Sequence, residues 1–189
     1  MKSLYIVPIG HVDEEVLRTI EVALWQVFGF TVQRLVPLPE PLYAYDGQRS
    51  QYSSALILRE LTALRPADMV RVLGITEADI FIPMLSFVFG HAQLSGSAAI
   101  VSLARLKQEF YHLPGNTELF LNRCIKEAVH EIGHTFGLIH CSDTSCAMSL
   151  SNAIHLVDSK SADVCPNCAI VLEQNIKKIF PGSGVENVP

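Results

Sequence analysis

The sequence is poor in charged residues and has no long run of lysine or arginine. Charged side chains make up 17% of the 189 residues, and the formal net charge is −5. Proteins that bind nucleic acid usually concentrate positive charge on one surface, so no nucleic acid partner is expected. Hydrophobic residues make up 49% of the chain. This is enough apolar material for a sizeable core, and it argues against a disordered protein.

Long apolar runs are missing as well. No uninterrupted apolar segment approaches the roughly 18–20 residues that span a bilayer. The apolar run that begins at Leu4 stops at Pro8 and Gly10, and it has neither the length nor the small-residue cleavage site of a secretory signal. We therefore expect a soluble cytoplasmic protein without a membrane partner. A monomer is expected, although no residue addresses the oligomeric state.

The order of predicted elements indicates an α/β fold in one compact domain. Strands that alternate with helices favour a mainly parallel sheet with helices on its faces. The expected strands cover residues 4–9, 31–38, 70–75, 81–89 and 98–103. The expected helices cover 14–28, a segment from Ser53 or Ser54 to Pro66, 118–136 and 169–180. Residues 37–51 and 90–96 are expected to be loops, the latter with an irregular edge as the alternative. Near His140 the composition changes to short polar turns, so the boundary between an N-terminal lobe (1–140) and a C-terminal lobe (141–189) is expected there.

The most informative stretch is His130-Glu-Ile-Gly-His134-Thr-Phe-Gly137-Leu-Ile-His140. His130 and His134 are four residues apart, so on a helix both rings project from one face and can reach a single metal ion. Glu131 is rotated about 100° around the axis, where it can hydrogen-bond a water on the metal. Helices often end at a glycine with positive φ. Gly137 can therefore reverse the chain so that His140 returns to the same ion.

Three protein ligands leave one coordination position open, which is the pattern of a catalytic zinc. Such an ion lowers the pKa of its water toward ~7, and Glu131 is expected to take the proton and pass it to the leaving amine. A bare His-Glu-x-x-His arises by chance fairly often, but Gly137 and His140 at these intervals make an accident improbable. Three imidazoles suit zinc, although iron, cobalt or nickel could also occupy the site.

The sequence has five cysteines, and this odd number argues against a framework in which every cysteine is paired in a disulfide. Four of them form a C-x4-C and a C-x2-C pair, namely Cys141, Cys146, Cys165 and Cys168. Four thiolates complete a tetrahedral zinc shell with no open position, so this second zinc would be structural. Two disulfides or unrelated buried thiols are the alternatives. Cys124 falls on the apolar stripe of a predicted helix and is expected to be a small core residue.

The segment from His130 to His140, followed by Cys141, Cys146, Met148, Cys165 and Cys168, resembles the archaemetzincins. The match is dense over residues 130–168 and looser at 73–76 and 87–90. The resemblance implies a single metzincin-like catalytic domain over residues 1–189, with a mixed, mostly parallel twisted sheet, an active-site helix and a small zinc-stabilised C-terminal lobe. It also implies a zinc metallopeptidase with two zinc ions per chain, one catalytic and one structural.

The same resemblance implies two further features of the site. Met148 would be the Met-turn residue, a hydrophobic floor beneath the three imidazoles that does not itself ligate zinc. An edge strand at about residues 87–93 would lie antiparallel over the cleft and pair with an extended peptide. No second oxyanion-stabilising residue stands out. The candidates by residue type alone are Tyr43, Tyr45, Tyr52, Tyr111, His91, His112 and His155.

Two classes of function fit these observations. The first is hydrolysis of peptide bonds through a zinc-bound water activated by Glu131, as an endopeptidase or an aminopeptidase. The second is a zinc-stabilised peptide-binding protein with little or no turnover. Zinc hydrolases that act on small amides complete the set. Glu131 favours hydrolysis, because a purely structural three-histidine site needs no carboxylate beside its open position.

Overall fold

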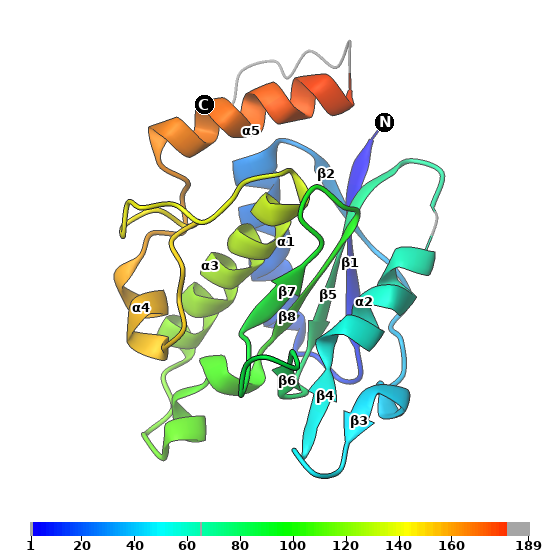
Figure 1. Cartoon of the computed structure of the whole chain (residues 1–189), viewed down its shortest axis with the longest axis vertical. Helices are drawn as coiled ribbons and strands as arrows, with labels where there is room; N and C mark the ends of the chain where they lie inside the picture. The colour runs from blue at the N-terminus through cyan, green and yellow to red at the C-terminus, as the bar shows by residue number, and fades with distance from the viewer. Residues whose placement is uncertain (1, 65, 181–189) are drawn as a thin grey trace.

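The computed structural model describes residues 2–64 and 66–180. Its main sheet has five strands in the order β2-β1-β5-β8-β7 (Figure 1). These strands are β1 (Ser3–Ile9), β2 (Thr31–Arg34), β5 (Met69–Thr76), β7 (Gly90–Ala92) and β8 (Ala98–Ser102). The first four in the sheet are parallel, and β7 runs antiparallel to β8 at one edge. The predicted α/β class with a mostly parallel sheet is confirmed.

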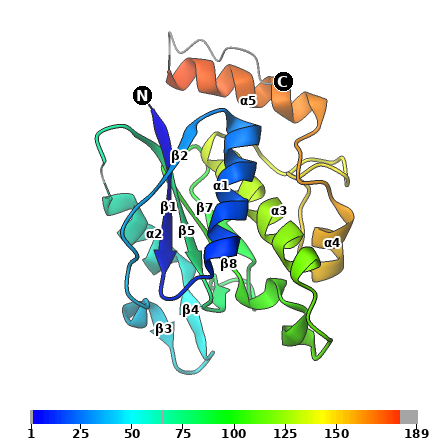
Figure 2. The ribbon, with the colours of Figure 1, turned by 180° about the vertical axis from the view of Figure 1, so that it is seen from behind.

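Helices cover both faces of this sheet. The helices are α1 (Glu14–Phe28), α2 (Ser54–Ala63), α3 (Thr117–Thr135), α4 (Ile154–Ser159) and α5 (Pro166–Ile179). Helices α1 and α3 lie side by side on one face and α2 lies on the other, as two opposite views show (Figures 1 and 2). Helix α5 crosses the end of the molecule at which β1 begins.

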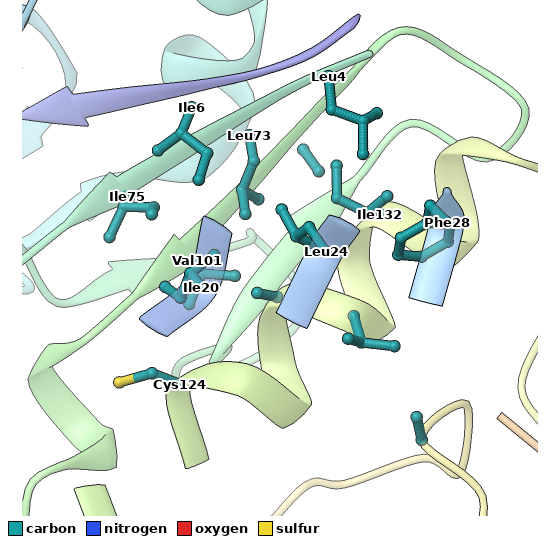
Figure 3. Packing of buried hydrophobic residues seen from close by; sticks show 14 of the residues in the cluster. Leu4, Ile6, Ile20, Leu24, Phe28, Leu73, Ile75, Val101, Cys124 and Ile132 are labelled. Carbon is teal, nitrogen blue, oxygen red and sulfur yellow. The ribbon is translucent and has the colours of Figure 1, made fainter. Parts of the chain in front are cut away.

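The core is divided by the sheet because strand side chains alternate between its faces. Leu4 and Ile6 of β1 join the cluster beneath α1 and α3, whereas Tyr5 and Val7 join the cluster beneath α2. Figure 3 shows part of the first cluster, and the residues that it labels come from the sheet, α1 and α3. Cys124 is completely buried in this cluster. This confirms its predicted role as a small core residue.

The described part of the C-terminal segment shares its core with the rest of the chain. Leu172 and Ile176 of α5 are buried in the same cluster as the residues of α1 and α3. Val157 of α4 belongs to that cluster too. Residues on both sides of the expected boundary at His140 therefore share one hydrophobic core.

The strand predicted for residues 81–89 is wrong. Within it only Phe81 is in a strand, as the end of β6 (Ile80–Phe81). That strand belongs to a small second sheet with β3 (Tyr45–Asp46) and β4 (Gln51–Ser53). The apolar residues that follow do not pair as a strand: Phe89 is buried in the core and its ring packs edge-on against Phe87 at 5.3 Å. The edge strand β7 lies at Gly90–Ala92, inside the segment 90–96 expected to be a loop or an irregular edge, and inside the antiparallel edge strand that the resemblance implies at about residues 87–93.

Smaller differences concern elements that are short. The predicted strand 31–38 ends at Arg34, although the backbones of Leu35 and Leu38 still donate hydrogen bonds to the carbonyls of Ile6 and Pro8. The predicted loop 37–51 contains β3 and the 3₁₀ turn Leu42–Ala44. Two further 3₁₀ turns, Ala104–Leu106 and Gln108–Tyr111, lead into α3. No helix in the described part of the chain is long and apolar enough to cross a membrane.

Candidate active site

Helix α3 carries the first two histidines of the motif, and the local sequence marks where it begins and ends. Asn116 caps the start, because its Oδ1 accepts a hydrogen bond of 3.0 Å from the backbone N–H of Leu119. The helix ends at Thr135, and Gly137 follows with a φ of +86°. A residue with a side chain rarely adopts this left-handed conformation. The resulting reversal returns the chain toward α3, and His140 comes next to its two partners.

The structure brings the three predicted histidines together. The ring centroids of His130 and His134 are 4.6 Å apart, and His140 lies 5.3 and 4.9 Å from these two rings. One nitrogen from each ring lies within 4.8 Å of the nitrogens of the other two. Three imidazoles can therefore bind one ion without a change in the backbone.

Hydrogen bonds select the tautomer that a metal ligand requires. The Nδ1 atom of His130 is 2.8 Å from the carbonyl of Ala147, and that of His134 is 2.7 Å from the carbonyl of Leu138. A carbonyl only accepts, so each Nδ1 donates and each neutral ring carries its lone pair on Nε2. The two Nε2 atoms are 3.0 Å apart. Two lone pairs at this distance repel each other unless a cation lies between them, so the donor set fits a metal ion.

Glu131 is buried beside this group, with 5% of its surface exposed. Burial raises the pKa of its carboxyl well above the ordinary value, and the nearby Glu127 raises it further, whereas Lys160 acts in the opposite direction. Burial also lowers the pKa values of His130, His134 and His140, and Lys160 lowers them further. Neutral imidazoles are the form that binds metal.

Gly90 of β7 sits against Glu131. A Cβ atom added at Gly90 would lie 2.4 Å from Cγ of Glu131 and 2.5 Å from its Oε1, which is closer than real atoms approach. The edge strand can therefore pass over the carboxylate only because residue 90 has no side chain. Sequence reasoning missed Gly90. An isolated glycine at the end of an apolar run is a signal of close backbone approach, and that signal was present.

A cleft with a volume of about 560 Å³ opens above the three histidines. Its walls are formed by the segment that leads into β7, by β7 itself, by α3 and by Leu150, Ser151 and Asn152. Of the seven tyrosines and histidines considered as a second electrophile, His91 lines this cleft. Its Nδ1 is 2.9 Å from the hydroxyl of Ser54, which itself donates to the carbonyl of Phe81. Nδ1 of His91 therefore donates to Ser54, and this hydrogen bond ties β7 to the start of α2.

Met148 is completely buried beneath the histidines' helix. A Cβ atom added at Gly133 of α3 would meet the Met148 sulfur at 2.5 Å, so the thioether packs directly on the helix backbone. The carbonyl of Met148 accepts a hydrogen bond of 2.9 Å from the N–H of Cys141. The preceding residue, Ala147, holds the His130 ring. The turn at Met148 is thus hydrogen-bonded to two candidate metal ligands, to the ring of His130 through Ala147 and to the backbone of Cys141 through Met148 itself.

The four cysteines of the C-terminal segment form a second cluster. The sulfurs of Cys141, Cys146, Cys165 and Cys168 lie within 4.8 Å of one another, and all five cysteines are free. The sulfurs of Cys141 and Cys165 are 3.8 Å apart. Two thiolates bound to one tetrahedral zinc at about 2.3 Å lie about 3.8 Å apart, whereas a disulfide needs about 2.05 Å. The donor set and its spacing therefore fit zinc.

Lys160 and Glu127 form a buried ion pair that the sequence did not indicate. Their charged atoms are 2.8 Å apart, and the side chains are 0% and 4% exposed. Glu127 lies on α3 one turn before Glu131, and it lines the cleft. Lys160 directly follows α4, so the pair joins the active-site helix α3 to the end of α4.

Comparison with known proteins places these features in a family. The sequence profile of Peptidase family M54 matches residues 38–174, which is more than half of the chain. The chain belongs to peptidase family M54. It is 45% identical over 161 residues to the archaemetzincin of Methanocaldococcus jannaschii, covering 85% of this chain and 87% of that protein.

Solved structures agree with this membership. The crystal structure of the archaemetzincin from Methanopyrus kandleri matches with a TM-score of 0.81 and 35% identity, covering 93% of this chain and 96% of that chain. A zinc-dependent peptidase from Methanocorpusculum labreanum matches with a TM-score of 0.81 and 30% identity, covering 89% and 99%. This family M54 protein is therefore a zinc metallopeptidase, and its histidine and cysteine clusters are its candidate zinc sites.

Proposed function

We propose that this protein hydrolyses peptide bonds in the cleft above His130, His134 and His140, which would hold the catalytic zinc, and that Glu131 is the general base. The observation that carries the proposal is the convergence of three neutral imidazoles beside a buried carboxylate and an open cleft. When bound, the zinc would supply a Lewis acid that polarises the scissile carbonyl and acidifies a water.

The residues of the chain would carry the proton. The Glu131 carboxylate would accept a proton from the attacking water and later donate it to the leaving amine nitrogen. Because Gly90 has no side chain, the edge strand, and with it a paired substrate, could lie close to that carboxylate.

Peptide binding would occur by strand addition to β7. The backbone of β7 alternates: the Phe89 carbonyl accepts from Ser102 and the Gln93 N–H donates to Ala98, so these odd-numbered residues face β8. The N–H and C=O groups of Gly90 and Ala92 therefore point away from β8. An extended peptide could pair with them and bring its carbonyl toward the three imidazoles.

The second zinc would be structural and bound by Cys141, Cys146, Cys165 and Cys168, which gives two zinc ions per chain. Met148 would be the Met-turn residue that supports the histidines. Residues 1–140 and 141–189 would act as one catalytic domain, since α5 shares the core of α1 and α3.

The test combines metal analysis with a screen of a peptide library, using wild type and Glu131→Ala. We expect two zinc ions per chain in both proteins and cleavage by wild type alone. Tight peptide binding without cleavage by either protein would instead identify a binding protein without turnover. Equal cleavage by both would show that Glu131 is not the base.

A further inference from the structure

Large apolar side chains are exposed around the mouth of the cleft. Leu85, Leu94, Ile139 and Leu150 line the cleft and are 50%, 59%, 70% and 56% exposed. They come from two stretches of the sequence, residues 85–94 and 139–150, and Met84 beside Leu85 is 87% exposed. We call these five residues the apolar rim. Clustered apolar exposure of this kind marks a binding surface on a folded protein.

Among the residues that the structure describes, the cleft lining itself carries no exposed charged side chain, and the nearest guanidinium at the rim is that of Arg49, which donates a hydrogen bond of 3.0 Å to the Leu85 carbonyl. In the described part of the chain, the carboxylates that line the cleft are Glu127 and Glu131, which are 3% and 5% exposed. Glu127 is already paired with the buried Lys160. No lysine or arginine lies among the described residues of the lining. A charged substrate side chain that enters the cleft would therefore lose water without gaining a partner among the lining residues.

The apolar rim extends to both ends of β7. Met84 and Leu85 lie before the strand, and Leu94 lies two residues after it. Gly90, which touches Glu131, is between them. A peptide paired along β7 would thus meet apolar surface before and after the point at which its backbone reaches the carboxylate. Ile139 directly precedes His140 and Leu150 follows the turn at Met148, and both side chains line the cleft.

From this arrangement we propose that the cleft selects extended polypeptide segments with large, uncharged apolar side chains on both sides of the scissile bond. Folded proteins bury such segments and unfolded proteins expose them, so the substrates would be unfolded or partly unfolded chains. The inference rests on the proposed peptidase function and names its substrate class. Continuity of the rim with the cleft and with the outward-facing backbone of β7 favours this occupant over a second copy of the chain.

The experiment measures binding separately from cleavage. The zinc-loaded Glu131→Gln protein is titrated with fluorescent peptides of equal length, blocked at both ends. One peptide has leucine and phenylalanine around its central bond, and its partner has lysine and glutamate there. We expect the apolar peptide to bind about tenfold tighter or more, because apolar pockets discriminate by about that much per side chain.

Variants of the rim locate this preference. In the same background, Leu94→Ser and Leu150→Ser are expected to lose about tenfold in affinity for the apolar peptide and little for the charged one. Val22→Ser and Val36→Ser are matched controls, because these side chains are 54% and 84% exposed and do not line the cleft. Neither control should change binding.

Equal or tighter binding of the charged peptide would overturn the inference, and so would rim variants that bind as the parent does. It would also be overturned if no peptide bound while the protein self-associated in a way that the rim substitutions abolish. Parallel assays with wild type separate the two proposals. Apolar binding without cleavage would defeat the peptidase proposal alone, whereas cleavage of both peptides with equal kcat/KM would defeat the substrate class alone.

Discussion

At the scale of single residues, Gly90 has a consequence for catalysis that its neighbours do not. Replacement by alanine would force Cβ into Cγ and Oε1 of Glu131, so either β7 or the carboxylate must move. A displacement of about 1 Å in a catalytic group lowers the rate about 10²-fold. We expect Gly90→Ala to lower kcat/KM by that order while zinc content stays unchanged, as measured with a cleaved peptide and by metal analysis.

The matched control for this substitution is Gly47→Ala. A Cβ atom added at Gly47 meets the ring of Tyr45 at 3.9 Å, an ordinary contact. The control should keep the activity of wild type. If Gly90→Ala also retained full activity, the close approach of β7 to Glu131 would have no catalytic role.

The buried pair of Lys160 and Glu127 predicts an asymmetry in stability. Lys160→Met leaves the Glu127 carboxylate buried without a partner, which costs about 3–5 kcal/mol in such pairs. Adding Glu127→Gln removes the unpaired charge and should recover part of that loss. Urea unfolding of the single and double variants measures both free energies. A single variant as stable as wild type would contradict the importance of this pair.

At the scale of elements, the end of α3 is completed by groups from three distant segments. The carbonyls of His134 and Thr135 accept hydrogen bonds from Ser95 N–H and from Nε of Arg71. The carbonyl of Phe136 accepts one from Nδ2 of Asn175. A cation is also favourable at this end of a helix dipole. The part of α3 that presents His134 is thus fixed by β5, the β7–β8 loop and α5.

Arg71 is expected to be the strongest of these contacts. Arg71 is 8% exposed, and its guanidinium also lies over the Phe136 ring at 4.7 Å. Arg71→Met should lower the free energy of unfolding by about 1.5–3 kcal/mol, the contribution of hydrogen bonds from a charged group. Arg59→Met, on the exposed surface of α2, should change it little. Chemical denaturation compares the two variants, and equal free energies of unfolding would show that Arg71 does not stabilise the end of α3.

The sequence predicted the elements whose ends follow local rules. Asp13 and Gly29 bound α1 as predicted, since the Asp13 side chain accepts from Glu15 N–H and Gly29 has a φ of +71°. The run 81–89 failed because periodicity cannot distinguish a buried strand from apolar residues that line a cleft. Helix α4 has six residues, too few to show a helical period. The conformation of such segments is determined by their tertiary contacts, which the local sequence does not show.

At the scale of the whole molecule, the cysteine cluster connects the last ligand candidate to the final helix. Cys141 follows His140 directly, and Cys165 and Cys168 lie at the start of α5. Removing one thiolate with Cys165→Ser should release the structural zinc, lower stability and reduce occupancy of the catalytic zinc. Cys124→Ala, a core substitution, should retain both ions. Metal analysis of purified protein measures this, and unchanged catalytic zinc in Cys165→Ser would contradict the coupling.

The candidate ligands could be predicted because they lie close together in the sequence. Seven of them fall between His130 and Cys168 at intervals that a helix, a glycine turn and two cysteine pairs dictate. The rest of the site could not be predicted in this way. Gly90 and Leu94 reach the cleft through the folded sheet, and Lys160 reaches Glu127 through the packing of α4, so no local pattern assigns them.

The central claim is that three imidazoles hold one zinc with a vacant position that Glu131 serves. A crystal structure of the zinc-loaded protein with anomalous data at the zinc edge tests it most directly. The account predicts one peak bounded by nitrogens of His130, His134 and His140 at about 2.0–2.1 Å, open toward the cleft, and a second bounded by four sulfurs at about 2.3 Å. Rings that point apart, or a fourth side chain in the open position, would contradict it.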